Sequence, residues 1–215
     1  MKLSLIEVEA MSKKAARGAG YSWGVAEEAA KAVGWLCRNG IDGVNALAVL
    51  LEQYDGAGAK LVGPNSLDGD WNSADGSAFC PLTVGASLSD CATLWGESGK
   101  DIANVCVPVL VVPFVAYSAR AVGNAMEVNF DDCSVVTDGQ SIWCSQFDDC
   151  LRVHMAENMS VRPAAISGKP LPVQIRAVPT KENWAVLERF AHRTYAPDTE
   201  ESRQKGAGAG LSDND

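Results

Sequence analysis

Apolar residues in the first quarter of the chain recur at helical spacing, and polar residues mark where each apolar stripe begins. Ser4 is followed three positions later by Glu7, which is the pattern of a capping box. Between Val25 and Leu36 the apolar side chains form one stripe, and glycines follow it. The pattern predicts three short-linked helices, which begin at Ser4, Ser22 and Asp42 and end near Gly18, Gly40 and Tyr54.

After Phe79 the pattern changes to short runs that are rich in β-branched residues, which is typical of strands. The predicted strands cover residues 105–115, 126–130, 133–137, 140–144 and 173–178. Asp138-Gly139 lies between two of these runs and indicates a hairpin with a two-residue turn.

That turn fixes a register for the predicted hairpin. Cys133 is expected opposite Cys144, Val135 opposite Ile142, and Phe130 opposite Phe147, with Phe130, Trp143 and Phe147 on the second face. Both faces then carry apolar side chains, so we expect the hairpin to be covered on each side.

A last amphipathic helix is predicted from Thr180 to the residues before Ala196-Pro197, and a further short helix over 198–205. The fold class is therefore α+β: an N-terminal three-helix cluster packed on a mainly antiparallel sheet, with a C-terminal docking helix. We expect a single domain over 1–215 with two lobes. They are a helical lobe over 1–55 and a sheet with the last helix over 79–205, separated by a loop over 56–78 and followed by a flexible tail over 206–215.

The charge of the chain excludes several classes of partner. The formal net charge is -9 and the pI about 4.7, so the long-range field repels phosphate backbones, and we expect no nucleic-acid partner. Lys13, Lys14 and Arg17 form the densest basic cluster, but their helix also carries Glu7 and Glu9, so we interpret this face as solvated.

We predict a cytoplasmic protein without a membrane anchor. The longest apolar stretch, 105–117, is broken by two prolines and is far shorter than the ~20 residues of a spanning helix. Residues 1–20 lack a secretory pattern. Seven cysteines without a Cys-x-x-Cys pair argue against a disulfide framework and against a zinc knuckle.

The sequence Phe-Asp-Asp-Cys occurs twice, at 130–133 and 147–150, with His154 nearby. Neighbouring aspartates on a strand point to opposite faces and cannot converge on one ion. We therefore interpret them as turn-favouring pairs at strand ends and predict no metal and no cofactor. Cys133 and Cys144 could form a disulfide in the predicted register, but two packed thiols are expected in a reducing compartment.

Arg17-Gly18-Ala19-Gly20-Tyr21-Ser22-Trp23-Gly24 resembles a glycine-rich loop that enters a helix, where exposed amides hold a carboxylate or phosphate. Its glycine spacing differs from the dinucleotide-binding fingerprint. The simpler interpretation is a glycine turn between two helices. If the turn binds a ligand, the candidate residues are Arg17, Ser22, Trp23 and Gly24.

A second polar group, His192-Arg193-Thr194-Tyr195, stands at the end of the last helix. His192 and Tyr195 are the candidate acid-base pair, and Arg193 is a candidate ligand-binding residue. Alternatively, His192 and Arg193 only complement the negative end of the helix dipole. The common hydrolase and phosphate-loop motifs are absent from the sequence.

Two resemblances can be stated. The stretch 18–29, together with Tyr195-Ala196-Pro197 and the ending 206–210, is similar to an uncharacterised bacterial family of unknown function, which implies no activity. Gly40-Ile41-Asp42-Gly43-Val44 resembles the helical start of the malate and sulfolactate dehydrogenase family. That family has an Asp-Ser-His-Gly motif, and the serine and histidine are missing here, so hydride transfer is not implied.

Two functional hypotheses follow. In the first, a small anionic metabolite is bound, or bound and transformed, in a cleft between the helical lobe and the sheet, between the glycine-rich turn and the group at 192–195. In the second, the protein is a non-catalytic structural or regulatory subunit that forms a homo-oligomer through aromatic residues such as Trp143.

Overall fold

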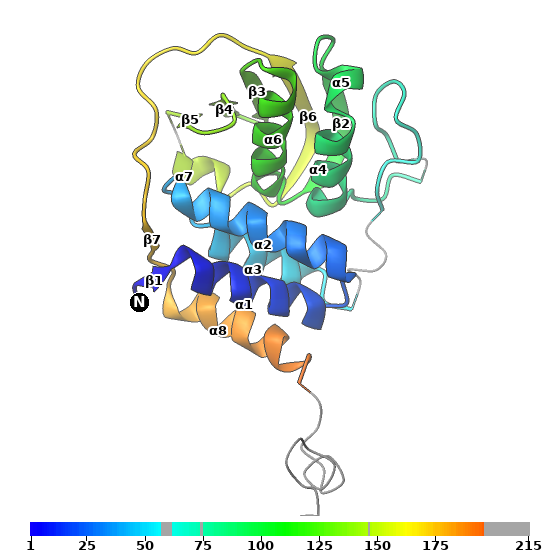
Figure 1. Ribbon diagram of the computed structural model, residues 1–215. Helices are drawn as coiled ribbons and strands as arrows, with labels where there is room; N and C mark the ends of the chain where they lie inside the picture. Colours follow the sequence, from blue (N-terminus) through cyan, green and yellow to red (C-terminus); the bar gives the residue numbers. More distant parts are fainter. Residues whose placement is uncertain (57–61, 74, 146, 196–215) are drawn as a thin grey trace, which may run out of the picture.

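The computed structural model describes residues 1–56, 62–73, 75–145 and 147–195, without the side chains of residues 147 and 148. A layer of helices α1, α2, α3 and α8 lies on one side, and a five-stranded sheet with further helices on its inner face lies on the other (Figure 1). Side chains from both parts belong to one hydrophobic core. The α+β class is confirmed, the division into lobes stays a prediction, and the predicted helix over 198–205 and tail over 206–215 lie outside the described residues.

The three N-terminal helices form where the capping residues predict them. They are α1 (Leu5–Gly18), α2 (Trp23–Arg38) and α3 (Gly43–Gln53). Ser4 and Glu7 make the reciprocal capping box, and the side chains of Ser22 and Asp42 accept hydrogen bonds at the next two helix starts. The first two helices pack directly on each other.

The docking helix α8 (Lys181–His192) begins at its cap residue Thr180. It packs against α1 and α3 and completes the helical layer. Its buried stripe is the predicted one and consists of Trp184, Leu187, Phe190 and Ala191.

Between this layer and the sheet lie helices that the sequence analysis did not predict. They are α4 (Pro81–Asp90), α5 (Ala92–Trp95), the 3₁₀ helix η2 (Pro108–Val111) and α6 (Val112–Val122). The predicted strand over 105–115 is therefore wrong beyond Cys106. Val107 has a φ of 41° and breaks the strand, and Pro108 and Pro113 stand in the first turns of the next two helices, where proline costs no hydrogen bond.

The main sheet is antiparallel with the strand order β2-β6-β3-β4-β5. Its strands are β2 (Lys100–Cys106), β3 (Met126–Phe130), β4 (Cys133–Thr137), β5 (Ile142–Trp143) and β6 (Met155–Pro163). Strand β6, which lies between β2 and β3, was not predicted. The predicted strand over 173–178 is reduced to β7 (Arg176–Ala177), which pairs with β1 (Leu3–Ser4) in a separate two-stranded sheet.

The register of the predicted hairpin is also wrong. Thr137 pairs with Ile142 and Val136 with Trp143, so four residues, not two, form the turn. The Asp138 side chain accepts hydrogen bonds from the amides of Gln140 and Ser141, both at 2.8 Å, and thereby holds the longer turn.

The two Phe-Asp-Asp-Cys segments fold differently. In the first, Phe130 pairs with Cys133, so Asp131 and Asp132 form a two-residue turn, as expected for aspartates at strand ends. The second forms the short helix α7 (Phe147–Cys150). Phe130 is consequently buried on the same face as Cys133. The prediction that Phe130 lies on the opposite face of the hairpin, together with Trp143 and Phe147, is therefore wrong.

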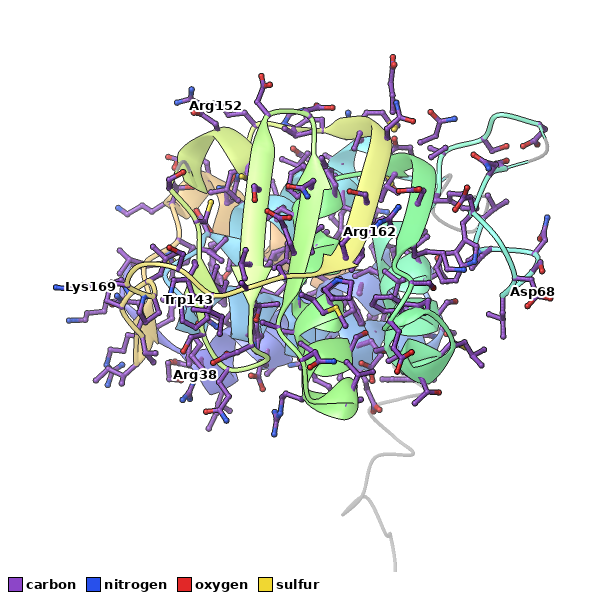
Figure 2. The ribbon with its side chains drawn as sticks, turned by 90° about the horizontal axis from the view of Figure 1, so that it is seen from above. Arg38, Asp68, Trp143, Arg152, Arg162 and Lys169 are labelled. Atoms are coloured by element: carbon purple, nitrogen blue, oxygen red, sulfur yellow. The ribbon has the colours of Figure 1, made fainter. Side chains whose placement is uncertain are left out.

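The other face of the sheet turns away from the helices, and Figure 2 views it directly. Here the strands present Glu127, Asn129 and Ser134, which are not buried. The part of the 56–78 loop that the structure describes follows the edge strand β2. Trp71 is only 2% exposed, and its backbone bonds with those of Asp101 and Ala103, so the loop covers this edge.

Among the described residues, no helix is both long and apolar enough to cross a membrane.

Candidate functional site

A hollow of about 700 Å³ opens at the end of the helical layer, where α1 and α8 finish and α2 begins. In Figure 1 this is the right-hand end of α1 and α8. Its lining consists of Ala10, Lys13, Lys14, Arg17, Gly18, Trp23, Arg193, Thr194 and Tyr195. We call it the cationic hollow, because four of these side chains are lysine or arginine.

Three of the cations come from one face of α1. Ala10, Lys13, Lys14 and Arg17 stand at the i, i+3, i+4 and i+7 positions of a helix, so their side chains project on the same side. This face lines the cationic hollow, and the interpretation of Lys13, Lys14 and Arg17 as a merely solvated face was incomplete. The periodicity was the signal that could have identified the two lysines as candidates.

Two exposed aromatic rings stand among the cations. Trp23 is 62% exposed, with the Arg17 guanidinium 4.6 Å and the Lys13 ammonium 5.6 Å from its ring centroid. Tyr195 is 56% exposed, and the Lys14 ammonium lies 5.9 Å from its centroid. Such cation–π contacts hold long, flexible side chains near defined positions.

Two of the four cations also have carboxylate partners. The Lys13 ammonium lies 2.6 Å from a carboxylate oxygen of Glu27. The Arg193 guanidinium donates two hydrogen bonds, of 2.6 and 2.8 Å, to the two carboxylate oxygens of Asp55. The Arg193 guanidinium holds the pKa of the Asp55 carboxyl below its usual value, so this pair stays ionised at neutral pH.

The other two cations are held differently. Arg17 donates a hydrogen bond to the carbonyl oxygen of Tyr21, while Lys14 contacts the Tyr195 ring. Within the described residues, the ion pairs include neither Arg17 nor Lys14. Two positive charges at the hollow are therefore left without a described carboxylate partner.

The two helix ends can meet here because Gly18 has no side chain. A Cβ atom at this position would lie 1.7 Å from the carbonyl oxygen of Phe190 in α8. Any other residue would push the ends of α1 and α8 apart, so this glycine sets the width of the hollow on that side.

The structure brings together four of the predicted site residues, Arg17, Trp23, Arg193 and Tyr195. Ser22 and Gly24 do not line the hollow. The Ser22 side chain instead caps α2 by accepting a hydrogen bond from the Val25 amide. The predicted location between the helical lobe and the sheet is wrong: the lining residues all come from the helical layer and the segments that follow its helices.

His192 lies beside the hollow and not in its lining. Its ring meets that of Tyr195 edge to face, with centroids 5.3 Å apart. The predicted acid-base pair is thus adjacent in space, and both side chains are exposed.

A second hollow, of about 390 Å³, lies over the outer face of the sheet and has the opposite electrostatic character. Asp70, Asp101 and Asp131 line it together with asparagine and serine side chains, so it repels anions. In the part of the chain that the structure describes, no group of three or more His, Cys, Asp or Glu side chains is arranged to hold a metal ion.

Comparison with known proteins gives one match. Residues 3–77 match the family described as "Protein of unknown function (DUF3726)", which confirms the expected likeness to an uncharacterised family over the N-terminal part of the chain. Searches of curated proteins and of solved structures gave no match. The matched segment contains α1, α2 and α3 and therefore most of the cationic hollow, while Arg193, Thr194 and Tyr195 lie outside it.

Proposed function

We propose that the cationic hollow binds a small organic anion. One observation carries this proposal: four lysine and arginine side chains, three from α1 and one from the residue that follows α8, line one hollow in a chain whose formal net charge is -9. The protein as a whole repels anions, whereas this hollow concentrates positive charge at one place. Such a local concentration is explained if the hollow attracts an anionic ligand.

The arrangement of charges favours a compact ligand that has both an anionic group and an apolar or planar part. Arg17 and Lys14 supply charge without a described carboxylate partner, and the faces of Trp23 and Tyr195 supply apolar surface. Because the two rings are largely exposed, covering them removes apolar area from water and adds to the electrostatic attraction. Inorganic phosphate alone would use only the charges.

The test is a thermal-shift screen followed by titration calorimetry with benzoate, citrate and inorganic phosphate. A ligand that binds only the native state raises the melting temperature, and the increase grows with the logarithm of its free concentration relative to its Kd. We expect benzoate to stabilise the protein, and citrate and inorganic phosphate, which lack an apolar or planar part, to do so less.

The matched variants are Lys14→Gln and Lys169→Gln, which remove the same charge inside and outside the hollow. Lys169 points into solvent at the edge of the molecule in Figure 2. Losing a charged hydrogen-bond partner costs about 1.5–3 kcal/mol, so Lys14→Gln should weaken binding roughly 10-fold or more. Equal weakening by both variants would mean that only the overall charge matters and would reject the hollow as the site.

The acid-base roles of His192 and Tyr195 stay predictions within this proposal. Their edge-to-face contact supports an interaction between the rings. If a bound ligand is turned over, His192→Gln should lower the turnover rate and leave the affinity unchanged, because His192 lies outside the lining.

A structural subunit that self-associates is the second candidate function, and a different surface favours it. Ile6, Ile175 and Val178 are 78%, 85% and 71% exposed, and all three lie next to the β1–β7 pair. Trp143, the expected contact, is half-buried instead and donates a hydrogen bond to the Gly168 carbonyl. Light scattering after gel filtration should show an oligomer that Ile175→Asp dissociates and that Leu94→Asp, at an exposed site on α5, does not.

A further inference from the structure

Three of the seven cysteines belong to the region where α7 contacts β4. Figure 1 shows α7 next to this part of the sheet. Cys133 begins β4, Cys144 directly follows β5, and Cys150 ends α7. The exposed fraction is 4% for Cys133 and 0% for Cys150, whereas Cys144 is half-buried. We call these residues the thiol cluster.

The Cys150 side chain lies at the centre of the thiol cluster. It is within hydrogen-bonding contact of the thiols of both Cys144 and Cys133. The pairing of β4 with β5 brings Cys133 and Cys144 close. Trp143, the residue before Cys144, pairs with Val136 in the strand that begins at Cys133. The contact of α7 with β4 adds Cys150, because this residue ends α7. Cys150 follows Cys144 after five intervening residues, so a bond between them would close a short loop.

Two chemistries are open to three adjacent thiols: binding a soft metal ion, or oxidation to a disulfide. The described residues offer no group of three or more His, Cys, Asp or Glu side chains with metal-binding geometry. All seven cysteines are in the thiol form in the structure. Oxidation is therefore the chemistry that the geometry favours.

We propose that the thiol cluster is a site of reversible disulfide formation, in which Cys144 is oxidised first and Cys150 closes the bond. The oxidant is a small neutral peroxide. Hydrogen peroxide converts the Cys144 thiol to a sulfenic acid and releases one water. The Cys150 sulfur then attacks the Cys144 sulfur, the S–O bond breaks, and a second water leaves with the proton from Cys150. Two electrons pass from the two sulfurs to the peroxide.

Cys133 has a role in the same site. Its thiolate can attack the Cys150 sulfur of the new disulfide, which forms the Cys133–Cys150 bond and returns Cys144 to a thiol. The half-buried cysteine is then available for a further oxidation, while the first disulfide is stored in the buried part of the cluster.

The surroundings make the attack by the Cys150 thiol, which closes the disulfide, slow near neutral pH. Hydrogen bonding to Cys144, together with burial, raises the pKa of the Cys150 thiol, and burial raises that of Cys133. The charged groups that face Cys133 are the carboxylates of Asp131 and Asp149, which also disfavour a thiolate. Because the thiolate is the reactive form, the rate of disulfide closure should increase with pH through the alkaline range.

A second pair of cysteines provides a matched internal control. Cys80 and Cys106 are adjacent across the bridge between Phe79 and Val105, and the Cys106 thiol donates to the Phe79 carbonyl at 3.1 Å. Their exposed fractions are 1% and 0%. This pair resembles the thiol cluster in proximity and burial but has no adjacent half-buried cysteine through which a peroxide could enter.

The experiment treats the full chain with hydrogen peroxide at several pH values and maps disulfides by mass spectrometry of non-reduced peptides. We expect a loss of two hydrogen atoms, a bond from Cys150 to Cys144 or Cys133, thiols retained at Cys80 and Cys106, and full reversal by dithiothreitol. The disulfide should raise the melting temperature by about 5 °C, the size expected for a cross-link in a domain of this length.

Variants test the order of the steps. Cys144→Ser should slow disulfide formation at least 10-fold, and Cys150→Ala should abolish it and leave a sulfenic acid that dimedone traps, whereas Cys37→Ala should react like the wild type. The mapping on wild-type protein does not depend on whether a variant folds. A first disulfide at Cys80–Cys106, or overoxidation of Cys144 without any bond to Cys150, would overturn the proposal.

Discussion

Replacing Gly18 by alanine tests whether α1 and α8 approach as closely as the structure indicates. The added Cβ would lie 1.7 Å from the Phe190 carbonyl oxygen, which is backbone and cannot rotate away. The normal separation of such atoms is about 3.5 Å, so the two helix ends must separate by roughly 1 Å or more. Gly18 does not need a left-handed φ, and the close approach alone explains the glycine.

The magnitude follows from two opposing effects. Overpacking of this kind costs about 1–3 kcal/mol, and alanine recovers up to about 1 kcal/mol through its better helix propensity. Gly24→Ala isolates the second effect, because Gly24 also lies in a helix and its added Cβ meets nothing within 4 Å. Because both variants gain helix propensity, we expect Gly18→Ala to be less stable than Gly24→Ala by the overpacking cost of about 1–3 kcal/mol, or roughly 2–12 °C in melting temperature.

The assay is thermal and urea-induced unfolding of both variants and the wild type, followed by circular dichroism. Gly24→Ala should be as stable as the wild type or slightly more stable. If Gly18→Ala unfolded at or above the wild-type temperature, α8 would not lie against the end of α1 as described. The width of the cationic hollow would then have to be set by something else.

Three further stability effects are expected. Ser4→Ala removes the capping box of α1 and should cost about 1 kcal/mol in urea unfolding, and an unchanged midpoint would contradict the cap. Burial raises the pKa of the Asp42 carboxyl, so this group favours folding when protonated and loses that contribution as the pH rises through its folded value. Asp42→Asn keeps a capping side chain and should thus be at least as stable as the wild type at pH 7. This advantage over the wild type should disappear near pH 3. Asp42→Ala, which has no capping side chain, should be about 1 kcal/mol less stable than Asp42→Asn. Leu187→Ala empties a fully buried position of α8 and should cost about 2–5 kcal/mol, and a cost under 1 kcal/mol would show that this helix contributes little.

The sequence predicted the helical layer well because its signals are local. A cap residue, an apolar stripe and a terminal glycine are all contained within one helix, as in α1 with Ser4 and Glu7. The sheet was harder. Strand β6 carries polar residues on its outer face, and its pairing with β2 and β3 joins segments that are far apart in the sequence.

The error over 105–115 has a specific physical origin. A run of valines suits a strand and a buried helix equally, so hydrophobic pattern alone cannot decide between them. The deciding signals were Pro108 and Pro113, which fit the first turns of η2 and α6 and would interrupt an internal strand. Proline was interpreted as a break in a membrane span, when it also marked two helix starts.

The candidate site was predicted in its residues better than in its location. Arg17, Trp23, Arg193 and Tyr195 meet, but the partner of the glycine-rich turn is the end of α8 and not the sheet. No local pattern in the sequence predicts that α8 packs against α1, because that contact depends on tertiary packing between residues at opposite ends of the chain.

The strand order has a consequence for how the chain folds during synthesis. Strands β2 and β3 are made before β6, yet neither can complete its pairing until residues 155–163 have left the ribosome. Until then the nascent chain exposes two unpaired strand edges, which are the places where chains associate wrongly. A truncation before residue 155 should therefore fail to close the sheet, and chaperone dependence should be greatest during this interval.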